Sequence, residues 1–320
     1  MSYVLGLHED TNANAAAISL DGSVLGAVAE GRLGRSKYQA GFPRRALHWL
    51  ADRGADRSAP AVEVVAANPL HPLPRLLGDH MPSGERDFLA PLQTAHLLWH
   101  ELLFRSPALR VAVRAASERG LRKALQRDFA MVGHHASHAA SAYYCGPWPE
   151  ATVVTCDNMG DGECARAFHG HGGRLEPLLA VGAWHSPGQF YGEVASVLGI
   201  DPMTAGKVTG LAARGEPAEA ARLLRQRLRS RPGGFQGPPL RQRRREASTW
   251  QALRSMRPAD VAAGAQQVLE EAVLPLVSDA VARTGCGRVA LAGGVFANVT
   301  LNRRILELPE VEAIHVHPAM

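Results

Sequence analysis

Apolar positions near the start of the chain recur in short blocks that are separated by polar turns. Apolar runs at 3–7, 15–20 and 23–30 flank the polar segment HEDTNAN and the dipeptide Asp21-Gly22. Asp-Gly between two apolar runs is a strong signal for a tight hairpin turn. The pattern therefore predicts a meander of three strands at the beginning of the chain.

A comparable pattern returns at residue 151. There ATVVTCD leads through NMGDGE to CARAFHG, and the pair Gly172-Gly173 precedes the apolar run RLEPLLAVGA. Two similar meanders about half a chain apart predict a duplicated domain, in which each half opens with a hairpin sheet. We expect the first half over residues 1–145 and the second over 146–320.

Helical and strand periodicities alternate in the rest of the chain. FPRRALHWLADRG has the spacing of an amphipathic helix, VEVVAANP that of a buried strand, and several helical segments follow between residues 70 and 125. A long helix is expected at 258–285, before the strand RVALAGG and a strand-to-helix turn at Gly293-Gly294. These elements predict an α/β fold.

Composition narrows the class of protein. A chain of 320 residues with 46% hydrophobic residues can bury a substantial core in one large or two medium domains. Its four cysteines form no CxxC pair, which argues against a disulfide framework and against a cysteine zinc site. With no charged-then-apolar leader and no apolar run of about 20 residues, we expect a cytoplasmic protein without a membrane span.

The net charge of +5 has a local origin. Residues 222–245 carry nine arginines and no acidic residue, so the remainder of the chain is net acidic. The centre of this segment is rich in Pro and Gly, and it predicts an exposed, mobile basic insertion at about 222–247. Because Phe235 alone among aromatic residues interleaves the arginines, we do not expect a nucleic-acid surface.

The segment HHASHAASAYY at 134–144 carries the most specific candidate chemistry. His134 and His138 stand at i and i+4, so they share one face of a helix, and the strand-like run ATVVTCD then delivers Asp157. A histidine by itself is more often a satisfied polar residue than a ligand. Two imidazoles and a carboxylate nevertheless make a three-ligand metal site with open positions, and we adopt this interpretation.

A second candidate site lies at the Gly293-Gly294 turn. Glycines there allow a ligand to approach the backbone closely, and a following helix would point free amides at a phosphate. Asn298 and Asn302 are spaced i and i+4 on the expected helix, where two amides could reach a nucleotide. The simpler alternative is a tight turn with no ligand, since GxGxxG is absent.

Taken together, several segments resemble the nodulation-type O-carbamoyltransferases, which act on nodulation factors, cephalosporins and aminoglycosides. The match runs in order along nearly the whole chain, apart from the arginine-rich segment and parts of 55–125. The segments are GFP at 41–43, HHASHAASAYY, GAW and FY within 182–191, GKVTGLAARGEP at 206–217, and LAGGVFANVTLNRRIL at 291–306.

The resemblance implies an actin/hexokinase-like α/β fold in two duplicated ribonuclease-H-like halves, similar to the universal tRNA threonylcarbamoyl-transfer proteins. It also implies a second, YrdC-like domain that makes carbamoyl adenylate from ATP and carbamoyl phosphate. The first domain then passes the carbamoyl group to a hydroxyl of a small-molecule or sugar-like acceptor. His134, His138 and Asp157 fall on three of the family's metal ligands, with iron favoured and zinc possible.

The resemblance also suggests roles for residues that bind the carbamoyl donor. Lys37 falls on a lysine near the carbamoyl phosphate ester, while Lys207, Gly293, Gly294 and Asn298 fall on stretches that contact the nucleotide. Cations and helix-end amides suit an AMP leaving group, and a metal or ammonium stabilises charge that builds on the carbonyl oxygen.

A general base for the acceptor hydroxyl is also required. Asp10, Asp161 and Glu163 are the candidates, because they lie in the turns expected to face the cleft. Of these we select Asp161 as the catalytic carboxylate. The alternatives stay open at this point.

The sequence departs from the family at three places. Asn12 and Ala13 stand where the family commonly has a His-Asp pair, and the acidic run after the first meander is reduced to Glu30, Gly31 and Arg32. The chain ends at HVHPAM, where the family continues into a fourth metal ligand and a final helix. We therefore expect an incomplete carboxyl-terminal half, belonging to a truncated chain or to one piece of a split system.

Three other functions fit parts of the sequence. A non-catalytic module that binds a metal and a nucleotide would account for Asn12 and for the missing fourth ligand. A tRNA threonylcarbamoyl-transfer protein would share the fold and the paired histidines, but GKVTGLAARGEP resembles the small-molecule branch. A sugar kinase on the same fold leaves HHASH without an explanation.

Overall fold

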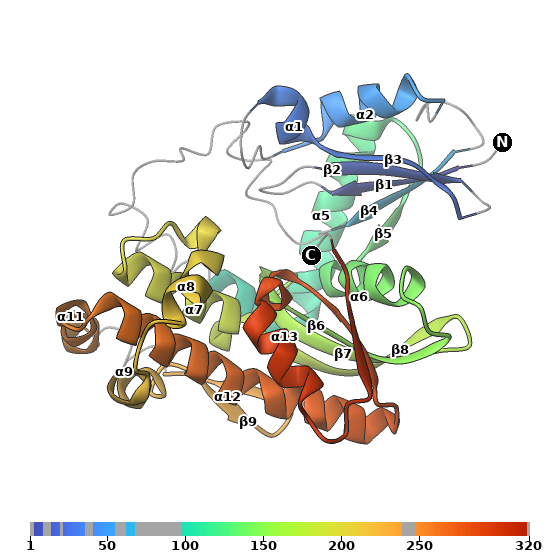
Figure 1. The fold of residues 1–320 in the computed structure, drawn as a ribbon. Helices are drawn as coiled ribbons and strands as arrows, with labels where there is room; N and C mark the ends of the chain where they lie inside the picture. Colours follow the sequence, from blue (N-terminus) through green and yellow to red (C-terminus); the bar gives the residue numbers. More distant parts are fainter. Residues whose placement is uncertain are drawn as a thin grey trace. The chain divides into compact units, whose positions relative to one another are not determined.

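A computed structural model describes residues 3–8, 14–19, 22–35, 41–54, 62–67, 98–238 and 247–318. The chain divides into two compact units, Met1–Ser137 and His138–Met320. Each unit contains one five-stranded sheet with its covering helices (Figure 1). Within the described part of the chain, no helix is both long enough and apolar enough to cross a membrane.

The sheet of the first unit has the strand order β3-β2-β1-β4-β5. Strands β1, β2 and β3 pair antiparallel, which confirms the predicted meander, and β4 and β5 extend the sheet in parallel. Gly22, between β2 and β3, has a positive φ of 88°. The strands are β1 (Tyr3–His8), β2 (Asn14–Ser19), β3 (Val24–Ala29), β4 (Val62–Ala67) and β5 (Ala130–Val132).

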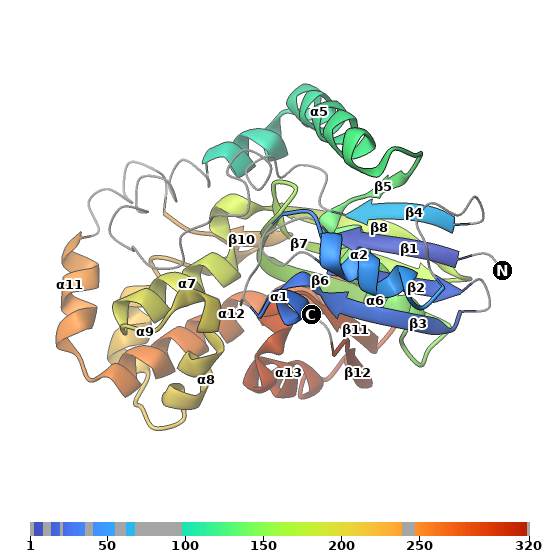
Figure 2. The ribbon, with the colours of Figure 1, turned by 90° about the horizontal axis from the view of Figure 1, so that it is seen from above.

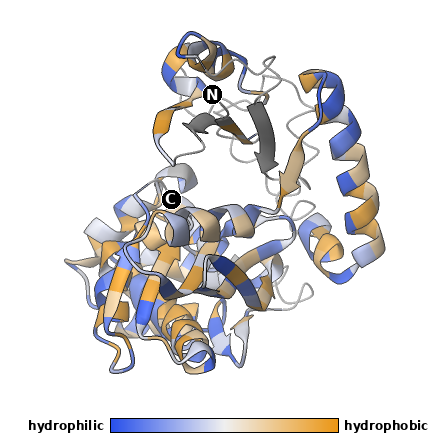
Figure 3. Ribbon diagram, turned by 90° about the vertical axis from the view of Figure 1, so that its right-hand side faces the viewer, coloured by the Kyte–Doolittle hydropathy of each residue, from blue (hydrophilic) through white to orange (hydrophobic). Residues whose placement is uncertain are grey.

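Two helices supply the core of the first unit. Leu5 and Leu7 project from the same face of β1, because alternate residues of a strand share a face. They join apolar residues of α2 (Arg44–Ala51) and of α5 (Pro107–Leu125) in one buried cluster. Figure 3 shows hydrophilic residues alternating with hydrophobic ones along α5, as expected for a helix with one face toward a core.

A buried carboxylate begins helix α2. Pro43 at the N-cap has no side chain that can accept a hydrogen bond, and Glu30 supplies the acceptor from the start of α1 (Glu30–Gly34). Its carboxylate accepts from the backbone N–H groups of Arg45 at 3.0 Å and Ala46 at 2.8 Å. A negative charge also interacts favourably with the positive end of the helix dipole. Glu30 therefore has a structural role at the start of α2.

The second unit repeats the topology of the first. Its strand order is β12-β11-β6-β7-β8, with antiparallel pairing among β6, β7 and β8 and parallel pairing of β11 with β6 and β12. Each strand thus has its counterpart in the first sheet, and the predicted duplication is confirmed. The strands are β6 (Glu150–Gly160), β7 (Glu163–His171), β8 (Arg174–Gly182), β11 (Arg288–Ala292) and β12 (Ala313–Val316).

Helices cover both faces of the second sheet. Val153 and Ala290 pack on one face with residues of α6 (His134–Tyr144), while Val154 and Leu291 belong to the core on the other face. Burial on both faces explains why these strands are apolar almost throughout. The division between the units falls inside α6, whose later residues Ala139 and Ala142 join the core of the second unit.

Helix α11 (Ala247–Ser255) supplies Leu253 to the larger core, and five further helices contribute to it. Figures 1 and 2 show four of them, α7, α8, α9 and α12, grouped together. The short helix α13 adds Leu301 and Ile305 to the same cluster. The helices are α7 (Pro187–Val197), α8 (Gly206–Ala212), α9 (Ala218–Leu224), α12 (Pro258–Thr284) and α13 (Val299–Leu306).

The interpretation of the arginine-rich segment as an exposed insertion was wrong for its described part. Leu224, Leu228 and Phe235 are fully or almost fully buried in the core of the second unit. The segment runs from α9 through the hairpin β9 (Arg229–Arg231) and β10 (Gly234–Gln236). These widely spaced apolar residues anchor the segment to the core. They are separated by arginines, so the apolar pattern could not be recognised in the sequence. Residues 239–246 lie outside the described part of the chain.

Candidate metal centre

Helix α6 places the two histidines on one side. The helix spans His134–Tyr144, as the sequence predicted, so His134 and His138 lie one turn apart. Ala139 and Ala142 face the sheet, and their small side chains let α6 approach it closely. Alanines therefore make the close contacts of this helix with the sheet, and the two imidazoles lie outside that packing cluster.

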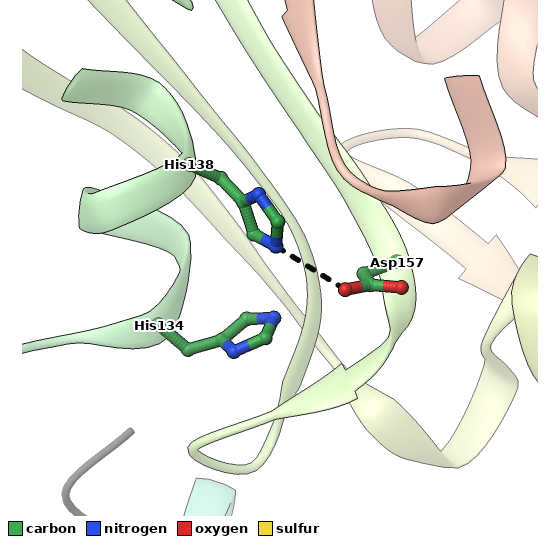
Figure 4. Close-up of side chains that lie close together, drawn as sticks. All are labelled: His134, His138 and Asp157. Atoms are coloured by element: carbon green, nitrogen blue, oxygen red, sulfur yellow. Dashed lines mark hydrogen bonds and ion pairs between the residues drawn. The ribbon is translucent and has the colours of Figure 1, made fainter. Parts of the chain in front are cut away.

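Strand β6 brings Asp157 to this helix. The pairing of β6 with β7 shifts register between Cys156 and Gly160, so Asp157 lies where the regular ladder is interrupted. Such irregularities commonly redirect a side chain near a functional site. Oδ1 of Asp157 accepts from the backbone N–H of Asn158 at 2.7 Å, and Oδ2 lies 3.3 Å from Nε2 of His138 (Figure 4).

The three predicted ligands fit one metal ion. One ligand atom from each of His134, His138 and Asp157 lies within 4.8 Å of the others, and all three residues are half-buried. The 3.3 Å between His138 and Asp157 matches the roughly 3.4 Å between two ligands of one tetrahedral ion. Among the residues that the structure describes, no other group of three His, Cys, Asp or Glu side chains converges in this way.

The cysteine beside Asp157 belongs to the core. Cys156 is fully buried, and burial raises the pKa of its thiol well above the ordinary value; neighbouring Cys164 and Asp157 act in the same direction. A thiol that keeps its proton is a poor metal ligand, because thiolate is the form that binds metals. Cys164 and Cys286 are also buried, whereas Cys145 is exposed.

The backbone of Asp157 is held by the start of α7. Ser186, the N-cap of that helix, donates its hydroxyl to the carbonyl oxygen of Asp157 at 3.1 Å and accepts from the N–H of Gln189 at 3.1 Å. A Cβ atom at Gly188 would lie 2.7 Å from Cα of Asn158, so only glycine allows this approach. Neither residue was predicted from the sequence, although Ser-Pro-Gly is a recognisable start of a helix.

The Gly293-Gly294 turn lies directly against the end of β6. Gly293 has a φ of 100°, and a Cβ atom there would lie 2.4 Å from the carbonyl oxygen of Cys156. A turn of 3-10 helix, Gly294–Ala297, separates it from α13. The chain thus passes from strand into a turn of 3-10 helix at Gly293-Gly294, as predicted, and the α-helix begins at Val299.

Asn298 is the N-cap of α13 and does not share the helix with Asn302. Its Oδ1 accepts from the N–H of Leu301 at 3.0 Å, and its Nδ2 donates to Gln266 Oε1 at 2.8 Å and to Thr209 Oγ1 at 3.2 Å. Asn302 instead donates to the carbonyl of Phe296 at 2.8 Å. Both amides thus donate within the protein, and the buried Oδ1 of Asn302 has no hydrogen-bond partner among the described residues. A contact from Asn298 to a nucleotide stays a prediction.

A buried polar network ties this turn to three helices. The hydroxyl of Tyr191 lies 3.0 Å from Thr209 Oγ1 and donates to Gln266 Oε1 at 2.8 Å, while Gln266 donates to Glu270 at 2.7 Å. Buried polar groups are costly unless every one has a partner, so the network specifies a single arrangement of the helices. The sequence carried no signal for Gln266, which lies 32 residues before Asn298.

Other predicted residues have different surroundings. Lys207 is exposed near the start of α8. The same helix carries Thr209, whose hydroxyl oxygen accepts a hydrogen bond from the side chain of Asn298.

Asp161 and Gly162 both have positive φ and form the two-residue turn between β6 and β7. A type I′ turn of this kind favours Asp-Gly, which gives Asp161 a structural reason. Lys37, Asp10, Asn12 and Ala13 lie outside the described residues.

Glu163 has a local partner. It is buried, and its carboxylate lies 2.6 Å from Nε of Arg166. The ion pair gives this carboxylate a structural role within the hairpin.

Comparison with known proteins identifies a family. A family model described as the carbamoyltransferase N-terminus matches residues 4–320. An uncharacterized protein of Synechocystis is 28% identical over 100% of this chain and 55% of its own length. The nodulation protein NolNO of Sinorhizobium fredii is 28% identical over 95% of this chain and 44% of its own. The chain spans about half the length of these relatives.

A solved structure shows the same fold. Component A of the (R)-2-hydroxyglutaryl-CoA dehydratase of Acidaminococcus fermentans is 14% identical, with a TM-score of 0.55 over 99% of this chain and 92% of its own. Together with the duplicated sheets, this likeness confirms the predicted actin/hexokinase-like α/β fold.

Proposed function

The chain belongs to the family of carbamoyltransferase N-terminal domains, and from this premise we propose that it is the transfer part of an O-carbamoyltransferase. The carbamoyl group would pass from carbamoyl adenylate to a hydroxyl of a small-molecule or sugar-like acceptor. A bond forms between the hydroxyl oxygen and the carbamoyl carbon. The bond from that carbon to the phosphate oxygen breaks, and AMP leaves with the electron pair.

The observation that carries this proposal is the convergence of His134, His138 and Asp157 within the segment that the family model matches. We propose that these three side chains hold a divalent metal. Two histidines and one carboxylate with open positions suit Fe(II), and zinc also accepts this ligand set. When bound, the ion would supply positive charge that polarises a carbonyl oxygen.

Other residues would bind the adenylate and handle the proton. Lys207, exposed at the start of α8, and the turn at 293–298 are proposed to bind the AMP part, because a leaving phosphate needs cations and backbone N–H groups. Lys37 is proposed near the carbamoyl ester. Asp161 is the proposed acceptor of the hydroxyl proton, since its turn follows Asp157 on the same hairpin.

The adenylate itself requires a second activity. We propose that a YrdC-like domain makes it from ATP and carbamoyl phosphate, either in the same polypeptide or in a separate chain. This chain would then act on a reactive intermediate that is best passed on without release into water.

Metal binding is the first test. Purified protein is stripped with a chelator, loaded anaerobically with Fe(II) or Zn(II), and analysed for metal after gel filtration. We expect about one ion per chain, lost in His138→Ala and in Asp157→Asn. His169→Ala is the matched control, because His169 pairs with Glu150 on β6 outside this group. Equal metal content in His138→Ala and His169→Ala would refute the assignment.

Transfer is the second test. The metal-loaded chain is combined with a YrdC-like domain, ATP, carbamoyl phosphate and a panel of hydroxylated acceptors, and products are followed by mass spectrometry. We expect carbamoylated product with the wild type and at least a hundredfold less with His138→Ala. If AMP and metal bind but no acceptor is carbamoylated, the chain is a non-catalytic binding module.

A further inference from the structure

Gly294 is a glycine that its own backbone does not require. Positive φ explains many glycines, and Gly293 with its φ of 100° is one of them. Gly294 is not among the residues with positive φ, and it begins a turn of 3-10 helix. Any L-amino acid can adopt such a conformation, and alanine would stabilise it by restricting the unfolded chain. The reason for glycine must therefore lie in its surroundings.

The neighbour that a side chain would meet is the carboxylate of Asp157. A Cβ atom at Gly294 would lie 3.0 Å from Oδ1 of Asp157 and 3.9 Å from its Cγ. Apart from the neighbouring backbone of its own segment, no other described residue lies within 4 Å of that position. A carbon atom and an oxygen atom at 3.0 Å are closer than van der Waals contact, so a methyl group would push this oxygen away by a few tenths of an ångström.

The backbone of Asp157 cannot move to make room. Ser186 donates to its carbonyl oxygen at 3.1 Å, and Gly188 of α7 packs against Asn158 so closely that no Cβ fits between them. On the preceding side, Cys156 is in the same kind of backbone contact with Gly293. Close contacts therefore confine the strand on both sides of Asp157.

The side chain of Asp157 could then make room only by rotating, and this rotation would move the carboxylate oxygen that faces His138. Oδ1 already accepts from the N–H of Asn158 at 2.7 Å. If Oδ1 moves away from residue 294, the rigid carboxylate also turns Oδ2, which lies 3.3 Å from Nε2 of His138. The position of Oδ2 relative to the two histidines thus depends on the absence of a side chain at residue 294, next to Oδ1.

We propose that Gly294 is a positioning residue for the metal centre: its missing side chain keeps the carboxylate of Asp157 turned toward His134 and His138. This inference rests on the proposed metal site. Bonds to a metal tolerate deviations of about 0.2 Å, which is less than the displacement that a methyl group would impose. Changes around the direct ligands typically cost 10- to 100-fold in metal affinity.

The test is a titration of the intact chain with Zn(II) alone. We expect Gly294→Ala to bind Zn(II) at least tenfold more weakly than the wild type. Gly192→Ala is the control, because Gly192 is also helical and its Cβ would have only Pro202 nearby, at an ordinary 3.6 Å. Equal affinities of wild type, Gly294→Ala and Gly192→Ala would overturn the positioning role, whereas absence of Zn(II) binding in the wild type would overturn the metal site as well.

A double-mutant cycle locates the contact independently of metal. Gly294→Ala should lower the thermal unfolding midpoint of the metal-free chain, and the same change in an Asp157→Ala background should not, because the oxygen that the methyl meets is gone. If Gly294→Ala proves too unstable to purify, recovery of folded protein in the double variant supports the contact. An equal loss in both backgrounds overturns it.

Discussion

Asn298 donates its side-chain amide to Oε1 of Gln266 at 2.8 Å, and so joins the cap of α13 to the middle of α12. The same Gln266 oxygen also accepts from the hydroxyl of Tyr191 at 2.8 Å. One buried acceptor therefore serves two donors from two other parts of the second unit. The arrangement gives the helices around the turn at 293–298 a single position relative to one another.

Gln266→Ala should destabilise the second unit strongly. It leaves the Tyr191 hydroxyl and the Asn298 amide without this acceptor, and a buried donor without a partner costs about 1–3 kcal/mol. We expect the free energy of unfolding in urea to fall by about 3 kcal/mol. Gln267→Ala is the matched control, because Gln267 bonds to Glu271 at the surface, and it should change stability by less than about 0.5 kcal/mol. Similar losses in the two variants would contradict the network.

Tyr191 should make stability fall at alkaline pH. Burial raises the pKa of Tyr191 to about 12, against about 10 in the unfolded chain. Between these values the folded protein keeps a proton that the unfolded chain has released. The contribution of the Tyr191 hydroxyl to the free energy of unfolding is therefore complete below pH 10 and is lost as the pH rises toward 12. The loss amounts to at most about 3 kcal/mol.

The measurement compares unfolding free energies at two alkaline pH values in Tyr191→Phe and in the wild type. The variant should show a smaller decrease, because phenylalanine has no proton to lose. Tyr144→Phe changes a tyrosine that is 59% exposed and should follow the wild type. If Tyr191→Phe and Tyr144→Phe behave alike, the alkaline sensitivity has another source.

Glu30→Ala should loosen the start of α2. The substitution removes both acceptors of the Arg45 and Ala46 N–H groups, with an expected cost of about 2 kcal/mol for the first unit. Hydrogen exchange at those two amides should accelerate by at least tenfold. Glu118→Ala, which breaks only an exposed pair with Arg114, is the control. Unchanged exchange at Ala46 in Glu30→Ala would show that the carboxylate does not cap the helix.

The stability of Arg227→Met should show whether the arginine-rich segment is anchored to the core or exposed to solvent. The side chain of Arg227 is 5% exposed, its Nη2 lies 2.6 Å from Oε2 of Glu193, and its Cζ lies 4.5 Å from the centroid of the Trp250 ring. Breaking a largely buried pair should cost about 3 kcal/mol. Arg225→Met is the counterpart, because its pair with Glu271 is exposed and should be worth less than about 1 kcal/mol. If Arg227→Met and Arg225→Met both lower the free energy of unfolding only slightly, the segment would behave as the exposed insertion that the sequence predicted.

Local periodicity accounted for much of the fold and indicated the three candidate metal ligands. The two meanders followed from short apolar runs and turn residues, and the i, i+4 spacing placed both histidines on one side of α6. Asp157 was found because a strand-like run ends beside it. Motif resemblance added the family, which the match over residues 4–320 confirmed.

Contacts between distant segments were not accessible in this way. Gln266 looks like any polar residue of a long helix, and nothing near it in the sequence indicates that Tyr191 and Asn298 converge on it. Nor did the sequence show that Asn298 caps the backbone of α13, whereas its contact with a nucleotide stays a prediction. Arg227 was grouped with its charged neighbours, although Trp250 and Glu193 cover it.

The sequence by itself determined which residues could bind a metal, because helical spacing and the end of a strand are local properties of the chain. Only the tertiary structure decided how these residues are held. The carboxylate of Asp157 owes its orientation to Ser186, Gly188 and Gly294, which come from two later segments. The physical reason is that close packing and hydrogen bonding act through space, so glycines that leave room for Asp157 can be recognised only once the neighbouring backbones are in place.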